Sequence, residues 1–128
     1  MKSAIRRPER PIILALRGDL GSGKTTFVQG LASALGIREK VQSPTFVLMK
    51  WYQPAKRFRP LRHLIHIDAY RLKNIGEARH LGLKQIFSER DAVVVIEWAD
   101  RIVKLLPEKT TWIKFRHTGG NHRLVTLK

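Results

Sequence analysis

The sequence feature that most constrains this chain is a glycine-rich loop between an apolar run and an amphipathic segment. Gly18-Asp19-Leu20-Gly21-Ser22-Gly23-Lys24-Thr25 fits the pattern G-x-x-x-x-G-K-[ST] in full. The glycines let successive backbone N–H groups point at a phosphate, and the following helix adds the positive end of its dipole. By chance, the four fixed positions occur together in well under about 1% of chains this long. The loop therefore predicts nucleotide binding, with Lys24 on the β- and γ-phosphates and the Thr25 hydroxyl on Mg²⁺.

The order of apolar segments around this loop predicts the fold. Predicted strands cover 11–17, 46–52, 62–67 and 92–96, and predicted helices cover 25–35, 75–87 with a break at Gly82, and 102–106 before Pro107. A hairpin is predicted over 111–127, with its turn at 118–121. Strands that alternate with helices and end in a hairpin indicate an α/β fold. We expect one P-loop NTPase-like domain over 1–128, a three-layer sandwich with a mixed, mostly parallel sheet and a C-terminal antiparallel hairpin.

Two of the few carboxylates stand where predicted strands end. Asp68 follows the apolar run 64–67, and Glu97 follows the run 92–96. A phosphate-loop NTPase needs an acid near Mg²⁺, usually at the carboxyl end of a strand beside the loop strand. One of the two carboxylates could hold the metal while the other orients or deprotonates the attacking water, and the sequence alone does not assign the roles. His66, two residues before Asp68, could face the same site or simply pack within its strand.

Two further residues are candidates for contact with the nucleotide. Thr45, in Ser43-Pro44-Thr45-Phe46, lies where P-loop proteins often carry a segment that senses the γ-phosphate. It could contact Mg²⁺ or its water, or the segment could be an ordinary turn into a strand. Trp98 could flank the nucleotide, or it could belong to the core.

Positive charge is the other conspicuous property of the chain. Its 25 Lys and Arg against 10 Asp and Glu give a formal net charge of +15, which indicates an anionic partner. Many of these cations lie in the N-terminal arm over 1–10 and in the segment Lys40–Arg62, here called the basic window, which contains no acid. Trp51, Tyr52 and Phe58 are interleaved there, a composition suited to RNA contact by phosphate binding and base stacking. The alternatives are contact with an acidic face of a partner protein and a solvated loop.

Composition also excludes several classes of protein. The chain has no cysteine, which rules out a disulfide scaffold, a thiol nucleophile and a Cys-ligated zinc site. No apolar run approaches the roughly 18 residues of a membrane-spanning helix, and the N-terminus lacks the features of a secretory signal. We therefore expect a cytoplasmic protein with no membrane contact.

Four motifs in this order resemble the TsaE family, the bacterial ATPases of tRNA threonylcarbamoyladenosine biosynthesis. They are Gly18 to Phe27, Ser43-Pro44-Thr45-Phe46, His66-Ile67-Asp68-Ala69-Tyr70-Arg71-Leu72 and Val95-Ile96-Glu97-Trp98. The resemblance implies a weak ATPase that uses ATP and Mg²⁺ and works with the TsaB and TsaD proteins in modifying A37 of tRNA. It implies phosphate binding by Gly21 to Thr26, Mg²⁺ binding by Thr25 and Glu97, and hydrolysis that depends on Asp68. It also implies that Trp98 and Arg123 lie near the nucleotide and that Thr45 belongs to a nucleotide-responsive loop.

Two other functions are compatible with the same residues. A small-molecule kinase of the phosphate-loop type would need an acceptor site and usually an arginine-rich lid, for which 128 residues leave little room. A nucleotide-gated RNA-binding module with vestigial hydrolysis would use the basic window, including Lys56, Arg57 and Arg59. The leading expectation is ATP hydrolysis as a switch, by in-line attack of water on the γ-phosphate.

Overall fold

The computed structural model describes residues 10–18, 23–41, 49–70, 72, 74–119 and 122–127, with the backbone alone at 75, 117–119 and 122–127. The elements follow the order β1 (Ile12–Gly18), α1 (Lys24–Ala34), β2 (Met49–Tyr52), η1 (Lys56–Phe58), β3 (His63–Asp68), α2 (Ile75–His80), α3 (Leu83–Ile86), β4 (Ala92–Glu97), η2 (Ala99–Leu105), β5 (Thr111–Gly119) and β6 (His122–Leu127). Of the predicted arm over 1–10, only Arg10 is described.

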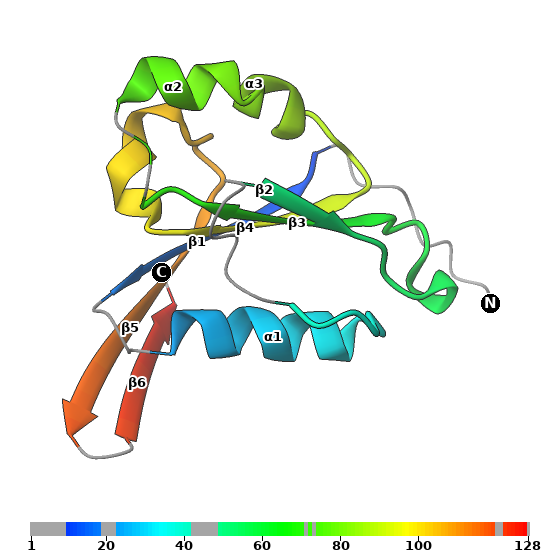
Figure 1. The fold of residues 1–128 in the computed structure, drawn as a ribbon, viewed down its shortest axis with the longest axis horizontal. Coiled ribbons are helices and arrows are strands. Elements are labelled where there is room, and N and C mark those ends of the chain that lie inside the picture. Colours follow the sequence, from blue (N-terminus) through cyan, green and yellow to red (C-terminus); the bar gives the residue numbers. More distant parts are fainter. Residues whose placement is uncertain are drawn as a thin grey trace.

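Within the described residues, six strands form one sheet in the order β2-β3-β4-β1-β5-β6. The four central strands are parallel, whereas β2 and β6 run antiparallel to their neighbours at the two edges. Helix α1 covers one face of this sheet, and α2, α3 and η2 cover the other, which gives three layers (Figure 1). The prediction of a mixed, mostly parallel sheet with a C-terminal antiparallel hairpin is confirmed.

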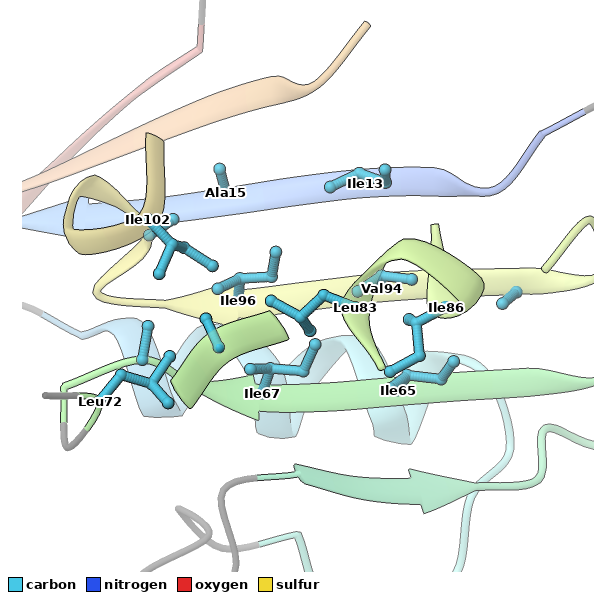
Figure 2. Close-up of a cluster of buried hydrophobic side chains, with 14 residues drawn as sticks. Ile13, Ala15, Ile65, Ile67, Leu72, Leu83, Ile86, Val94, Ile96 and Ile102 are labelled. Atoms are coloured by element: carbon cyan, nitrogen blue, oxygen red, sulfur yellow. The ribbon is translucent and has the colours of Figure 1, made fainter. Parts of the chain in front are cut away.

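Strand alternation divides the core between the two faces of the sheet. On one face, Ile65 and Ile67 of β3 and Val94 and Ile96 of β4 pack with residues of α2, α3 and η2 (Figure 2). On the opposite face, Leu64 and residues of the neighbouring strands pack against α1. Because both faces are covered, the central strands read as continuous apolar runs, which is typical of parallel sheets. The polar residues in these strands are therefore exceptions that need a separate explanation.

The glycines at the helix ends behave as the sequence predicts. Gly36, two residues after the end of α1, has a φ of 74°, and Gly82, between α2 and α3, has a φ of 77°. Both lie in the left-handed region, where a side chain is disfavoured and glycine is not. The helical segment over 75–87 is accordingly broken at Gly82, as predicted.

Other segments differ from the prediction. Residues 99–105 form the 3-10 helix η2, in which Ile102 has non-helical angles, whereas an amphipathic helix over 102–106 was expected. Ile102 is buried, but Val103 is 51% exposed, so the expected apolar stripe does not face the core throughout. The predicted strand over 46–52 is described from Met49 onward.

In the described part of the chain, no helix has the length and apolar character needed to cross a bilayer. That residues 1–128 form a single domain stays a prediction.

Candidate functional site

The candidate site lies at the carboxyl end of the parallel strands. Asp68 and Glu97 are the last residues of β3 and β4 and are paired in register, and Leu16 of β1 pairs with Glu97 on its other side. In a strand, alternate residues point to the same face, so Asp68 and Glu97 share the face of Leu64 and Val95, which pack toward α1. Helix α1 begins at Lys24, directly after the glycine-rich loop. The topology thus brings Glu97 to the start of this helix, with Asp68 beside it on the neighbouring strand.

Lys24 is nearly buried at this end of the sheet, with 5% of its surface exposed. Its Nζ atom donates to the carbonyl oxygen of Gly18 at 2.5 Å and lies 3.9 Å from the centre of the Trp98 ring. A buried ammonium group needs such partners, because desolvation without them is costly. The lysine therefore rests between the end of β1 and an aromatic face, at the base of the loop that would bind a phosphate.

Glu97 is 3% exposed and is held through both carboxylate oxygens. Oε1 accepts a hydrogen bond from Thr25 Oγ1 at 3.2 Å, and Oε2 lies 2.6 Å from Nε2 of His66. His66 is fully buried. Three residues from α1, β4 and β3 thus form one connected polar chain, Thr25–Glu97–His66, inside a predominantly apolar part of the protein.

The pairing of Thr25 with Glu97 fits the chemistry of a magnesium ion. Both atoms are hard oxygen donors, the type that Mg²⁺ prefers, and adjacent ligands of an octahedral Mg²⁺ lie about 3 Å apart. The observed 3.2 Å between Thr25 Oγ1 and Glu97 Oε1 agrees with that spacing. Among the residues that the structure describes, no group of three or more His, Cys, Asp or Glu could hold a metal ion. Nucleotide-dependent Mg²⁺ usually takes only one or two protein carboxylates, with phosphates and water supplying the rest.

Asp68 is the second carboxylate of the site and is 9% exposed. Its Oδ1 accepts a hydrogen bond from the backbone N–H of Tyr70 at 2.9 Å, which ties the carboxylate to the turn after β3. The backbone N–H of Ala69 in the same turn donates to the carbonyl oxygen of Glu97 at 2.9 Å. The ends of the two strands are therefore fastened to each other just beyond the two carboxylates.

Trp98 has an unusual backbone for an aromatic residue. Its φ of 59° and ψ of 39° lie in the left-handed region, which bulky side chains rarely adopt. In this conformation its ring lies over Lys24 and 4.9 Å from the Tyr70 ring, and Arg101 stacks on Tyr70 at 5.4 Å. Strained backbone of this kind is concentrated at functional sites. The conformation places an aromatic pair beside the phosphate-loop lysine.

The remaining predicted site residues are described only in part. Gly21, Ser22 and Thr45 lie outside the described residues. Gly18 ends β1, Gly23 precedes α1 with a φ of 102°, and Thr26 is exposed in the first turn of α1. Only the backbone of Arg123 is described. Arg123 pairs with His117 of β5. Phe115, two residues earlier in β5, pairs with Gly18 of β1, so Arg123 stands at the same end of the sheet as Gly18.

Sequence reasoning left the orientation of His66 open and did not propose its contact with Glu97. The signal was present, because His66 interrupts the apolar run 64–67 and has the same strand parity as Asp68. It was ambiguous because β3 and β4 are separated by more than twenty residues of chain. Only their register shows that His66 approaches Glu97.

Most cations of the basic window lie in its loop 53–62, away from this site. This loop leads into the amino end of β3, and Ala55 N donates to Leu35 O at the end of α1. Lys50, in β2, instead pairs in register with His66. The strand rise separates His63 at that end from Asp68 by about 17 Å. The cations of the window are all exposed: Lys40, Lys50, Lys56, Arg57, Arg59 and Arg62.

The aromatic residues of the window correct one expectation. Trp51 is 43% exposed and Phe58 is half-buried, but Tyr52 is 2% exposed and belongs to the core beside α1. Tyr52 is therefore not available for stacking on a base. The expected interleaving of three aromatic contacts with the cations is wrong at this position, because strand alternation turns Tyr52 inward and Trp51 outward.

Comparison with known proteins decides the family. The family model described as "Threonylcarbamoyl adenosine biosynthesis protein TsaE" matches residues 2–125. The chain belongs to the TsaE family. The TsaE protein of Bacillus subtilis is 39% identical over 115 residues, covering 90% of this chain and 68% of that protein. The TsaE protein of Treponema pallidum is 36% identical over 119 residues, covering 93% and 83%.

A solved structure of the TsaE family also has this fold. The crystal structure of Bacillus subtilis YdiB superposes with a TM-score of 0.72 at 34% identity, covering 92% of this chain and 68% of that one. The resemblance of the motifs to TsaE proteins is thereby confirmed, and with it a place for this chain in a family of tRNA threonylcarbamoyladenosine biosynthesis.

Proposed function

We propose that this TsaE protein binds ATP with Mg²⁺ and hydrolyses it, acting in the cytoplasm as a nucleotide switch on the TsaB–TsaD pair that modifies A37 of tRNA. The observation that carries the proposal is the convergence of Lys24, Thr25 and Glu97 where the glycine-rich loop meets the carboxyl ends of β1 and β4. This is the place where α/β nucleotide-binding proteins hold phosphate groups.

Each side chain has a role that its contacts support. Lys24, now on Gly18 O and the Trp98 ring, would exchange these partners for the β- and γ-phosphate oxygens. Thr25 and Glu97 would hold Mg²⁺, which neutralises phosphate charge when bound. Asp68 would orient the attacking water, because Glu97 is already engaged with Thr25 and His66. The bond from water to the γ-phosphorus forms as the bond to the leaving ADP oxygen breaks, giving ADP and phosphate; one proton of the water stays on the phosphate and the other is released to solvent.

Binding of the nucleotide would draw on several further groups. The N–H groups at the start of α1 and in Gly21 to Thr26 would donate to the phosphates, and Trp98 and Arg123 would lie beside the nucleotide. Thr45 would respond to the γ-phosphate. Rearrangement at Lys24 and Trp98 on binding provides a local change that the TsaB–TsaD pair can detect.

For contact with tRNA, we propose the basic window. The support is that its six cations are exposed, that the window contains no acid, and that Trp51 presents 43% of its surface. Exposed Lys and Arg side chains neutralise phosphates and release counterions, so such binding should be sensitive to salt.

The hydrolysis proposal is tested by ATP turnover with and without the TsaB–TsaD pair, for the wild type and for Lys24→Ala and Glu97→Ala. We expect weak turnover that rises with the partners and is lost in both variants. Stimulated turnover that survives both substitutions would show that this site is not the one that hydrolyses ATP. A phosphorylated acceptor in place of free phosphate would instead indicate a kinase.

A further inference from the structure

His66 is a polar side chain where its strand requires only apolar ones. Its neighbours in β3, from Leu64 to Ile67, are fully buried aliphatic residues, and His66 itself has 0% exposure. An apolar side chain would fill this position without loss of hydration, whereas a buried imidazole is tolerated only when it is hydrogen-bonded. Packing alone therefore does not explain a histidine at this position.

The imidazole has one polar partner in the described part of the chain. Nε2 lies 2.6 Å from Oε2 of Glu97, whereas the buried Nδ1 has no hydrogen-bond partner there. An ionised carboxylate only accepts hydrogen bonds, so when Glu97 is ionised Nε2 is the donor in this contact. Its polar contact is directed to the carboxylate on the neighbouring strand.

That contact decides the orientation of Glu97. With Oε2 fixed by His66, Oε1 is the oxygen directed to Thr25 Oγ1, at 3.2 Å. Without the bond to Nε2, the carboxylate could rotate about its last side-chain torsion, which is broad for glutamate. Groups that hydrogen-bond to metal-binding side chains set the orientation of those side chains. Loss of such a group commonly weakens metal affinity about 10- to 100-fold.

We propose that His66 is a positioning residue: its Nε2–H group fixes Glu97 so that Oε1 faces Thr25, where Mg²⁺ would be held. The inference rests on the proposed function, because it concerns the metal of the Mg·ATP complex. It predicts that His66 affects the affinity for the metal and leaves the affinity for the metal-free nucleotide nearly unchanged.

The test measures binding rather than turnover. Mn²⁺ replaces Mg²⁺, and its affinity is followed by electron paramagnetic resonance in the presence of a non-hydrolysable ATP analogue. Binding of the same analogue is measured separately in EDTA. We expect His66→Leu to weaken Mn²⁺ about 10-fold or more, with analogue binding in EDTA within about twofold of wild type. His63→Leu, on the same strand with its ring against Trp51 at 5.0 Å, is the control and should leave both unchanged.

Two amide variants test whether a donor at the position of Nε2 is what Glu97 requires, while position 66 stays polar. The amide of Gln can reach the position of Nε2 and donate to Glu97, whereas the shorter Asn places its amide nearer the position of Nδ1. His66→Gln should retain Mn²⁺ affinity within about threefold, and His66→Asn should lose it as His66→Leu does. If His66→Leu fails to fold, this pair decides the matter by itself.

The outcomes separate the inference from the function on which it rests. Wild-type Mn²⁺ affinity in His66→Leu, or equal affinities in the Gln and Asn variants, would overturn the positioning role and leave the proposed function intact. A loss of metal-free analogue binding equal to the loss of Mn²⁺ binding would show a structural role instead. A wild-type protein that binds the analogue but no Mn²⁺ would overturn the metal site and the inference together.

Discussion

The two ends of the parallel strands carry charge in different ways. At the carboxyl end, Lys24, Asp68 and Glu97 are between 3% and 9% exposed, and each is hydrogen-bonded to a named neighbour. At the amino end, Arg62 and the other cations of the loop 53–62 are exposed, and Arg62 reaches Asp91 only at 3.9 Å. A few buried groups in fixed geometry suit chemistry on one ligand. Many exposed cations suit long-range attraction of an anionic surface. The net charge of +15 therefore describes the second region better than the first.

Removal of one lysine from each end should give the largest difference between the two regions. Lys24→Met should reduce partner-stimulated ATP turnover at least about 100-fold, because it removes a buried cation placed to stabilise the developing phosphate charge. Lys56→Met, an identical change in the exposed loop, should leave turnover within about twofold. Release of phosphate at saturating Mg·ATP measures both. Comparable losses of turnover in the two variants would contradict the assignment of the chemistry to the carboxyl end alone.

Charge reversal in the basic window should have the next largest effect, on a different property. Replacing Lys56, Arg57 and Arg59 by Glu should weaken tRNA binding about 10-fold or more at low salt and flatten its salt dependence, because fewer phosphates are neutralised. Fluorescence-polarisation titrations at several salt concentrations measure this, with ATP turnover without partners as a check that the other end is unaffected.

An equally charged control comes from a different face. Arg79, Lys84 and Lys104 are exposed cations around an apolar groove between α2, α3 and η2, with a volume of about 660 Å³. Their triple replacement by Glu changes the net charge by the same amount. If it weakens tRNA binding as much as the first triple, the effect depends on net charge and not on the basic window.

The smallest effects should come from single polar contacts outside the site. Asn74 caps α2, with Oδ1 accepting from the backbone N–H of Glu77 at 2.8 Å, and Asn74→Ala should lower the free energy of unfolding by about 1 kcal/mol. At the other end, the carboxylate of Asp91 faces an arginine whose side chain is 60% exposed, and Asp91→Asn should change it by less than about 1 kcal/mol. Chemical denaturation measures both. A larger loss for Asp91→Asn than for Asn74→Ala would show that the amino end depends on fixed ion pairs.

Much of the fold could be predicted because it depends on local pattern. The apolar runs before Gly18, Asp68 and Glu97 mark strands, and the glycine-rich loop marks the start of α1. The order of the strands in the sheet is not a local property. It places β4 between β3 and β1, which are far apart in the sequence, and this order alone brings His66 to Glu97.

The site could be predicted for residues that belong to a motif and not for those that act through a neighbour. Lys24, Thr25, Asp68 and Glu97 were predicted, and the structure gathers them, although their roles stay predictions. The contacts of Lys24 with Trp98, and of Trp98 with Tyr70, depend on one left-handed residue after β4. No sequence rule predicts such a conformation for tryptophan, since its energy must be offset by surrounding contacts.

The first glycine of the phosphate-binding pattern is under a constraint that has nothing to do with phosphate. Gly18 has a φ of 146°, and a Cβ atom added to it would overlap the carbonyl oxygen of Phe115 on β5. Natural selection on the architecture would therefore preserve this glycine even in a descendant that had lost its ligand. An intact glycine pattern in a distant relative would then record shared ancestry of the sheet, and the lysine and the threonine would be the better markers of retained chemistry.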